Sequence, residues 1–214
     1  MPGSCYIENQ RRAIDLQNVE QVRSFIAIEL PQDVKKELYR IEHIMKQGGH
    51  TGIKWVNPEG IHITLKFLGN ISTTQITAVN EAIKETTQGF PPFRLEIAGV
   101  GAFPDLRQPH VLWVAINGEV DRLSELQQKL GSLLVSCNIP KEARTFVPHL
   151  TLARIKDSVL PEERRNIGAF IKPLRINARI SFDVQTVSLM RSQLTSKGAI
   201  YSCLFMANLN PRGV

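Results

Sequence analysis

The sequence predicts an α+β protein made of two lobes that pack on each other and share a cleft. Strand-like and helix-like segments alternate along the 214 residues, which is typical of sheets covered by helices. Two segments, His62–Leu65 and His149–Leu152, both read histidine, apolar residue, threonine, leucine. Each lies in a strand-like run that is followed by a helical pattern. This repetition, 87 residues apart, indicates an internal duplication.

The patterning divides the chain into three regions. Residues 1–21 are polar with weak periodicity, and we expect them to form a flexible N-terminal extension. Residues 22–209 carry the whole alternation and are expected to form one bilobal domain. Residues 210–214 are expected to be a C-terminal tail. No low-complexity linker separates the two halves of the domain.

The first half is expected to contain four strands and two helices. Apolar residues recur at helical spacing from Val34 to Met45, and a glycine pair then ends this helix. Ser72 with Gln75 three residues later resembles a capping box, which predicts the start of the second helix. The strands are expected at residues 22–30, 53–56, from the first histidine motif to Gly69, and at 93–103.

The second half also alternates between strands and helices. A third helix starts near Val120 and stops before Pro140, and Pro161 is suited to the first position of a fourth helix. The strands are expected at residues 109–116, at about 146–156 around the second motif, and at 180–190 and 199–207.

Composition excludes several classes of protein. No apolar run approaches the roughly 20 residues that a membrane span needs, and the first residues lack the order of a secretory signal. The three cysteines, Cys5, Cys137 and Cys203, are scattered, which argues against a disulfide framework or a zinc site. We therefore expect a cytoplasmic protein without a membrane partner.

The positive charge is concentrated in one part of the chain. The net charge is +6, and residues 141–197 carry 11 Lys and Arg against 5 Asp and Glu, while the other positions hold 15 of each. The whole excess therefore lies around and after the second motif. Such a basic region would attract a polyanion such as nucleic acid, or it is simply a solvated face.

The two motifs offer acid–base chemistry. Side chains alternate across a strand, so His62 and Thr64 share one face, while Ile63, Leu65 and Phe67 are expected on the other. A single motif of this kind is usually the polar face of an amphipathic strand. Two converging imidazoles, however, could take and give a proton in phosphodiester cleavage, with the threonines bound to phosphate oxygens. The sequence offers no acidic cluster for a two-metal site, so we expect no metal and no cofactor.

Several segments together resemble a known family. They are Arg23–Ile28, Lys54–Val56, His62–Gly69, Val111–Val114 and Pro148–Arg154. They resemble the RNA 2',3'-cyclic phosphodiesterase branch of the two-histidine phosphoesterases, historically called 2'-5' RNA ligases, over about residues 22–209. The resemblance implies a pseudo-twofold fold with two antiparallel sheets, flanked by helices, around a central cleft. It also implies hydrolysis of RNA 2',3'-cyclic phosphate ends to 2'-phosphates.

The resemblance assigns roles to the four motif residues. It implies that His62 and His149 are the catalytic acid–base pair and that Thr64 and Thr151 bind the phosphate. We assign His62 as the general acid toward the leaving 3'-oxygen and His149 as the general base toward water, although the sequence does not fix this direction.

Three further residues are expected to bind substrate. Arg154 matches an arginine that the family keeps near the phosphate, but simple alternation puts it on the face opposite His149. A bulge or the end of the strand could return it to the cleft, and otherwise it is a surface charge. Lys66 has the parity of His62 and could neutralise phosphate, or is simply solvated. Phe25 could stack on a nucleobase, or belongs to the core.

The expected partners are RNA ends with a 2',3'-cyclic phosphate or related nucleotides, bound by a monomer. Within the same enzyme class, a 2'-5' RNA ligase or a phosphodiesterase for a small cyclic nucleotide remains open. A non-catalytic RNA-binding protein is the alternative from a different class, but phosphate binding alone would favour Arg or Lys over paired His and Thr.

Overall fold

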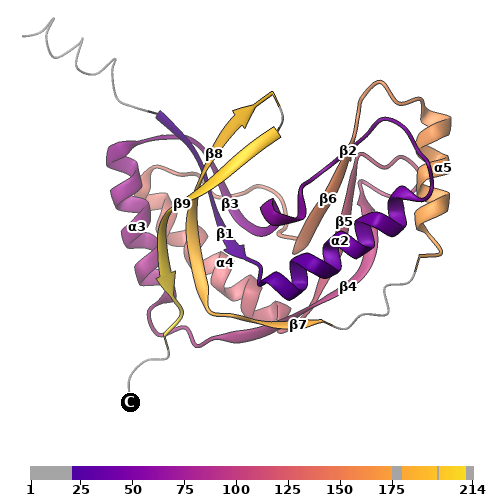
Figure 1. Ribbon diagram of the computed structural model, residues 1–214. Helices are drawn as coiled ribbons and strands as arrows, with labels where there is room; N and C mark the ends of the chain where they lie inside the picture. The colour runs from indigo at the N-terminus through magenta and orange to yellow at the C-terminus, as the bar shows by residue number, and fades with distance from the viewer. Residues whose placement is uncertain (1–20, 175–179, 197, 211–214) are drawn as a thin grey trace, which may run out of the picture.

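The computed structural model describes residues 21–174, 180–196 and 198–210 (Figure 1). Most of the extension expected at 1–21 and of the tail expected at 210–214 lies outside these residues. Gln21, however, is already the first residue of a strand, and Asn210 pairs with Gln88. None of the helices in this described part is long and apolar enough to cross a membrane.

Within the described residues, nine strands form two antiparallel sheets. Sheet A has four strands in the order β3-β1-β8-β9, and sheet B has five in the order β2-β6-β5-β4-β7. The strands are β1 (Gln21–Glu29), β2 (Ile53–Trp55), β3 (His62–Ser72), β4 (Phe93–Phe103), β5 (Val111–Gly118), β6 (His149–Ile155), β7 (Ser181–Val184), β8 (Thr186–Thr195) and β9 (Gly198–Asn208). The first motif thus belongs to sheet A and the second to sheet B, and β3 and β6 contact each other.

Four α-helices flank the sheets, α3 and α4 beside sheet A and α2 and α5 beside sheet B (Figure 1). They are α2 (Gln32–Lys46), α3 (Thr73–Thr87), α4 (Val120–Leu134) and α5 (Pro161–Ile171), with short 3-10 turns η1 (Pro58–Gly60) and η2 (Val135–Cys137). Ser72 and Gln75 form the expected capping box at the start of α3, and Pro161 is the first residue of α5. The predicted α+β fold with two antiparallel sheets flanked by helices is confirmed.

The apolar core fills the space between the sheets and their helices. It contains buried residues of both sheets and of the four helices, for example Ile26 of β1, Leu112 of β5, Leu38 of α2 and Leu126 of α4. The opposite side of each sheet carries the motif residues. We call this side the inner face: it carries His62 and Thr64 in sheet A, and His149 and Thr151 in sheet B.

Both motif strands contain a β-bulge directly after the threonine. In β3, Thr64 pairs with Ala27 and Lys66 with Ile26, so Leu65 is an extra residue. In β6, Thr151 pairs with Trp113 and Ala153 with Leu112, so Leu152 is an extra residue. A bulge shifts the alternation of side chains by one, and every later residue changes face. The repeated leucine is therefore the residue at which each strand departs from simple alternation.

Two predicted strand boundaries are wrong. The strand expected at residues 180–190 is two strands, because β7 pairs with β4 in sheet B whereas β8 pairs with β1 in sheet A. Only Gln185 separates them. The first motif strand was expected to end at Gly69, but it continues to Ser72, since β1 pairs with it along that whole length.

One cation of the basic region has a structural role. Arg164 on α5 is buried, and its guanidinium donates hydrogen bonds to the carbonyl oxygens of Val159, Pro109 and Lys156 at 3.2, 2.8 and 2.7 Å. It joins α5 to the loop before β5 and to the end of β6. Arg164 therefore contributes to the fold rather than to a basic surface.

We predict that Arg164→Met lowers the free energy of unfolding by about 3 kcal/mol, because it leaves three carbonyl oxygens without their donor. Urea denaturation followed by circular dichroism would measure this. Arg165→Met changes the neighbouring exposed arginine and is the matched control. A loss below about 0.5 kcal/mol for Arg164→Met would contradict the prediction.

Candidate active site

The two motif histidines are held by the same backbone contact. His62 Nδ1 lies 2.8 Å from the carbonyl oxygen of Gly60, and His149 Nδ1 lies 2.7 Å from that of Val147. A carbonyl oxygen only accepts, so Nδ1 carries the hydrogen in both rings. This leaves Nε2 of each imidazole to exchange a proton with a ligand. The carbonyl lies two residues before the histidine in both cases, so the duplication extends to this contact.

Aromatic rings surround His62. The ring of Phe25 stacks on it with centroids 4.5 Å apart, and the ring of Tyr201 meets it edge-on at 5.3 Å. Burial beneath these rings lowers the pKa of His62 from its ordinary value. The hydrogen bond to Gly60 and the nearby carboxylate of Glu29, directly opposite in the register, both raise the pKa but do not offset the burial. His62 is therefore easier to deprotonate than a free imidazole.

His149 has a different aromatic neighbour. Phe103 on β4 meets its ring edge-on at 4.9 Å and also contacts Trp113 at 5.1 Å. Trp113 pairs with Thr151 on the inner face, and its indole lies over Gly101. A Cβ at Gly101 would lie 2.4 Å from the indole, so the absence of a side chain makes room for Trp113. The rings of Phe103 and Trp113 thus form an aromatic surface next to the second motif.

Arg154 lies on the inner face of sheet B. The bulge at Leu152 reverses the alternation, so Arg154 shares the side of Thr151 and is exposed. A bulge was one of the two ways in which Arg154 could lie on the face of His149, and this bulge is present. Its role toward a substrate stays a prediction.

Lys66 does not lie on the face of His62. The bulge at Leu65 turns it to the other side of β3, where it is 6% exposed. Its Nζ donates to the carbonyl oxygen of Pro140 at 2.6 Å and to the carboxylate of Glu142 at 3.1 Å. The expectation that Lys66 shares the site with His62 is wrong, because simple alternation ignores the bulge. Through these hydrogen bonds, Lys66 instead connects β3 to the segment before β6.

The structure also tests the aromatic predictions on β1 and β3. Phe25 was expected either to stack on a nucleobase or to belong to the core, and it is 3% exposed and lies beneath His62, in agreement with the second interpretation. Phe67 was expected on the apolar face, but it is 63% exposed and contacts Phe25 on the inner face, at a centroid distance of 6.4 Å. Phe67 follows His62 by five residues, as Arg154 follows His149. At this equivalent position, sheet A therefore carries the exposed aromatic ring of Phe67, where sheet B carries the cation of Arg154.

Sequence reasoning missed Tyr201, Phe103 and Lys54 as neighbours of the site. Tyr201 lies near the end of the chain, and no motif there points to the first histidine. Phe103 and Lys54 lie on strands whose pairing brings them to the inner face, and pairing cannot be read from local patterns. The signal for Phe67 was present, since its offset from His62 equals that of Arg154 from His149.

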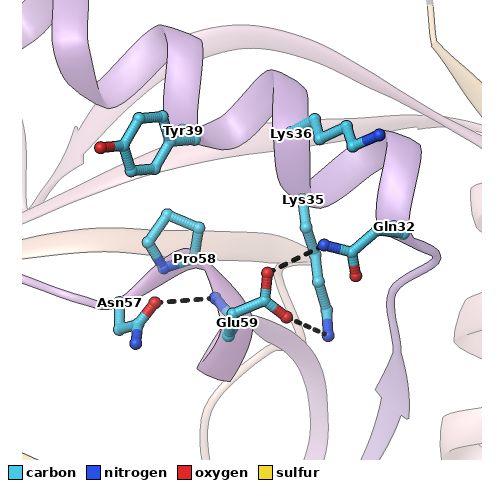
Figure 2. A pocket seen from close by; sticks show the side chains of 7 residues that line it. All are labelled: Gln32, Lys35, Lys36, Tyr39, Asn57, Pro58 and Glu59. Atoms are coloured by element: carbon cyan, nitrogen blue, oxygen red, sulfur yellow. Dashed lines mark hydrogen bonds and ion pairs between the residues drawn. The ribbon is translucent and has the colours of Figure 1, made fainter.

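A pocket of about 250 Å³ lies outside this face, between the start of α2 and η1 (Figure 2). Its lining comprises Gln32, Lys35, Lys36, Tyr39, Asn57, Pro58 and Glu59. Gln32 and Lys35 donate to the carboxylate of Glu59 at 2.9 and 3.3 Å, and Asn57 accepts from its backbone N–H at 3.1 Å. The pocket contains neither motif histidine. Its residues hold η1, whose last residue is the carbonyl partner of His62.

The described residues, 21–174, 180–196 and 198–210, contain no group of three or more His, Cys, Asp or Glu side chains that could hold a metal ion. The inner faces instead carry the imidazoles of both motifs, the two threonine hydroxyls, the cationic side chains of Arg154 and Lys54, and several aromatic rings. This set can exchange protons and bind an anion.

The duplication is also visible in the comparison with known proteins. The family model for LigT-like phosphoesterases matches the chain twice, at residues 28–113 and 114–201, and each match contains one histidine motif. The chain belongs to the LigT-like phosphoesterases. The resemblance stated from the sequence is confirmed.

Two relatives named RNA 2',3'-cyclic phosphodiesterase cover most of the chain. The protein of Methanothermobacter thermautotrophicus is 33% identical over 182 residues, which cover 85% of this chain and 96% of the relative. That of Aquifex aeolicus is 34% identical over 150 residues, which cover 70% of this chain and 78% of the relative.

Solved structures share the fold. TT0787 of Thermus thermophilus is 27% identical with a TM-score of 0.71, covering 87% of this chain and 97% of that one. Escherichia coli LigT, solved with 3'-AMP, is 23% identical with a TM-score of 0.71 and covers 89% and 99%. Its likeness supports the bilobal architecture alone.

We predict that Phe25→Leu raises the pKa of His62 toward the ordinary value of about 6.5, because the stacked ring no longer excludes water. An NMR titration of the His62 ring protons would show this, with Phe90→Leu, at another buried phenylalanine, as control. Since the folded-state pKa lies below the unfolded one, neutral His62 supports stability above about pH 6.5, and this support is lost as pH falls toward the folded pKa. Phe25→Leu brings the folded-state pKa of His62 closer to the unfolded one, so this pH-dependent contribution to stability becomes smaller. An unchanged pKa would refute the role of the stacked ring.

Proposed function

We propose that this protein hydrolyses RNA 2',3'-cyclic phosphate ends to 2'-phosphates without a metal ion. The observation that carries the proposal is the duplicated histidine site, in which both rings donate Nδ1–H to a carbonyl and present Nε2. The named relatives support the substrate class. We further propose that it acts as a monomer in the cytoplasm, where a free, exposed thiol such as that of Cys203 persists.

The reaction needs one proton acceptor and one proton donor. Water attacks phosphorus as a base removes its proton, the bond from phosphorus to the 3'-oxygen breaks, and an acid protonates that oxygen. The phosphate stays on the 2'-oxygen. Thr64 and Thr151 donate hydrogen bonds to the non-bridging oxygens, and Arg154 offsets their charge as it builds. No atom of the protein forms a covalent bond in this scheme.

The roles of the two histidines follow the assignment made from the family. His149 accepts the proton of water, and His62 protonates the 3'-oxygen. Burial lowers the pKa of His62 in the free protein, which disfavours the protonated form that a general acid needs, and substrate binding must offset this. A bound phosphate does so, because a negative charge nearby favours the imidazolium form.

We predict that purified protein converts a 2',3'-cyclic-ended RNA to a 2'-phosphate in the presence of EDTA, and that His62→Ala and His149→Ala each reduce kcat by at least about 100-fold. Separation of 2'- and 3'-phosphate products by chromatography would measure both claims. His110→Ala, at an exposed histidine outside the motifs, is the matched control. Activity that survives both motif substitutions, or that EDTA abolishes, would overturn the proposal. A new 2'-5' linkage would identify a ligase.

We also predict a shift in the pH profile of kcat/KM for Phe25→Leu. If His62 is the acid, its raised pKa moves the alkaline limb to higher pH, since this limb reports the acid of the free enzyme. Rates measured between about pH 5 and 9 at low substrate concentration would show the change. Movement of the acidic limb instead would exchange the roles of His62 and His149.

A further inference from the structure

A pair of cations lies on the inner face of sheet B beyond the second motif. Lys54 on β2 is directly opposite Arg154 on β6 in the antiparallel register. Opposite residues point to the same side, with Cβ atoms about 5 Å apart. Their neighbours along the strands, Ile53 opposite Ile155 and Trp55 opposite Ala153, point toward the core instead. Both cations are exposed.

This pair has no counter-charge within the part of the chain that the structure describes. None of the ion pairs in residues 21–174, 180–196 and 198–210 includes Lys54 or Arg154. The next residue of the same row, Val111 on β5, is apolar. Like charges directly opposite each other destabilise a sheet. The arrangement is unfavourable for the free protein and is relieved when an anion binds between the two side chains.

The position of the pair indicates which anion. Arg154 follows Thr151 on the same face of the same strand, so the cations lie one bulge beyond the hydroxyl proposed to bind the reacting phosphate. Lys156, also exposed, comes two residues after Arg154, which is about 6.6 Å along an extended strand. Positive charge therefore continues just past the end of β6, away from the motif, at a spacing that suits successive phosphates of one nucleic-acid strand.

We propose that Lys54, beside Arg154, binds the phosphodiester on the 5' side of the terminal nucleotide. The preferred substrate is then the end of an RNA chain and not a free cyclic mononucleotide, which has no phosphate at that position. The inference rests on the proposed function. Because Lys54 and Arg154 would contact only phosphates of the RNA, they position the RNA end without selecting its sequence.

The test compares adenosine 2',3'-cyclic phosphate with the dinucleotide ApA that has the same cyclic end, which adds one adenosine and the phosphodiester on the 5' side. Lys54→Ala is expected to lower kcat/KM for the dinucleotide about fivefold, the effect of one exposed ion pair, and to leave the mononucleotide rate unchanged. The slope of log kcat/KM against log salt for the dinucleotide should become shallower by about 0.7. Lys36→Ala removes the same charge from α2, beside the pocket of Figure 2, and should change neither rate.

Binding gives a second measurement that does not depend on turnover. ApA ending in a 2'-phosphate is expected to bind Lys54→Ala about fivefold more weakly than the unmodified protein, while adenosine 2'-monophosphate binds both equally. The melting temperature of Lys54→Ala should not fall, since no contact is lost. Equal effects on both substrates, or none on either, would overturn the inference. Absence of turnover by the unmodified protein would refute the proposed function, and the binding comparison would still decide the role of Lys54.

Discussion

The extra residue after each motif threonine determines what the two strands present to a substrate. Leu65 and Leu152 are both buried in the core, and each takes a position in its strand without a partner across the ladder. Without these bulges, Phe67 and Arg154 would point into the core and Lys66 would share the face of His62. With them, each motif strand offers a histidine, a threonine and a third group five residues after the histidine. The repeated leucine, although buried, thus decides which side chains of each motif strand lie on the inner face.

The two halves keep the same backbone around the histidines but surround them differently. Both imidazoles donate to the carbonyl two residues earlier, so both are fixed in the same tautomer. His62 is stacked on Phe25 and partly buried, whereas His149 touches Phe103 edge-on. The third group is an open aromatic ring in one half and a guanidinium in the other. A duplicated scaffold thereby supplies two unlike groups, which is what a reaction with one acid and one base requires.

Much of the fold and the four motif residues of the site could be predicted from local patterns. Helical periodicity, the capping box at Ser72 and the proline at position 161 located the helices, because these signals act within a few residues. The bulges could not be predicted, since a strand with one extra residue has no distinct local pattern, and this error misplaced Lys66 and Phe67. The break at Gln185 was missed because neither glycine nor proline marks it. Tyr201 and Lys54 reach the inner faces only through pairing with distant strands.

The direct passage from β7 to β8 has a mechanical consequence. The last strand of sheet B and a central strand of sheet A are joined by Gln185 alone, whose carbonyl oxygen also accepts a hydrogen bond from the N–H of Leu209 at 2.7 Å. One residue spans at most about 3.6 Å, so the sheets cannot slide past each other at this corner. A relative movement of the two sheets at this corner is therefore limited to a change of the angle between β7 and β8.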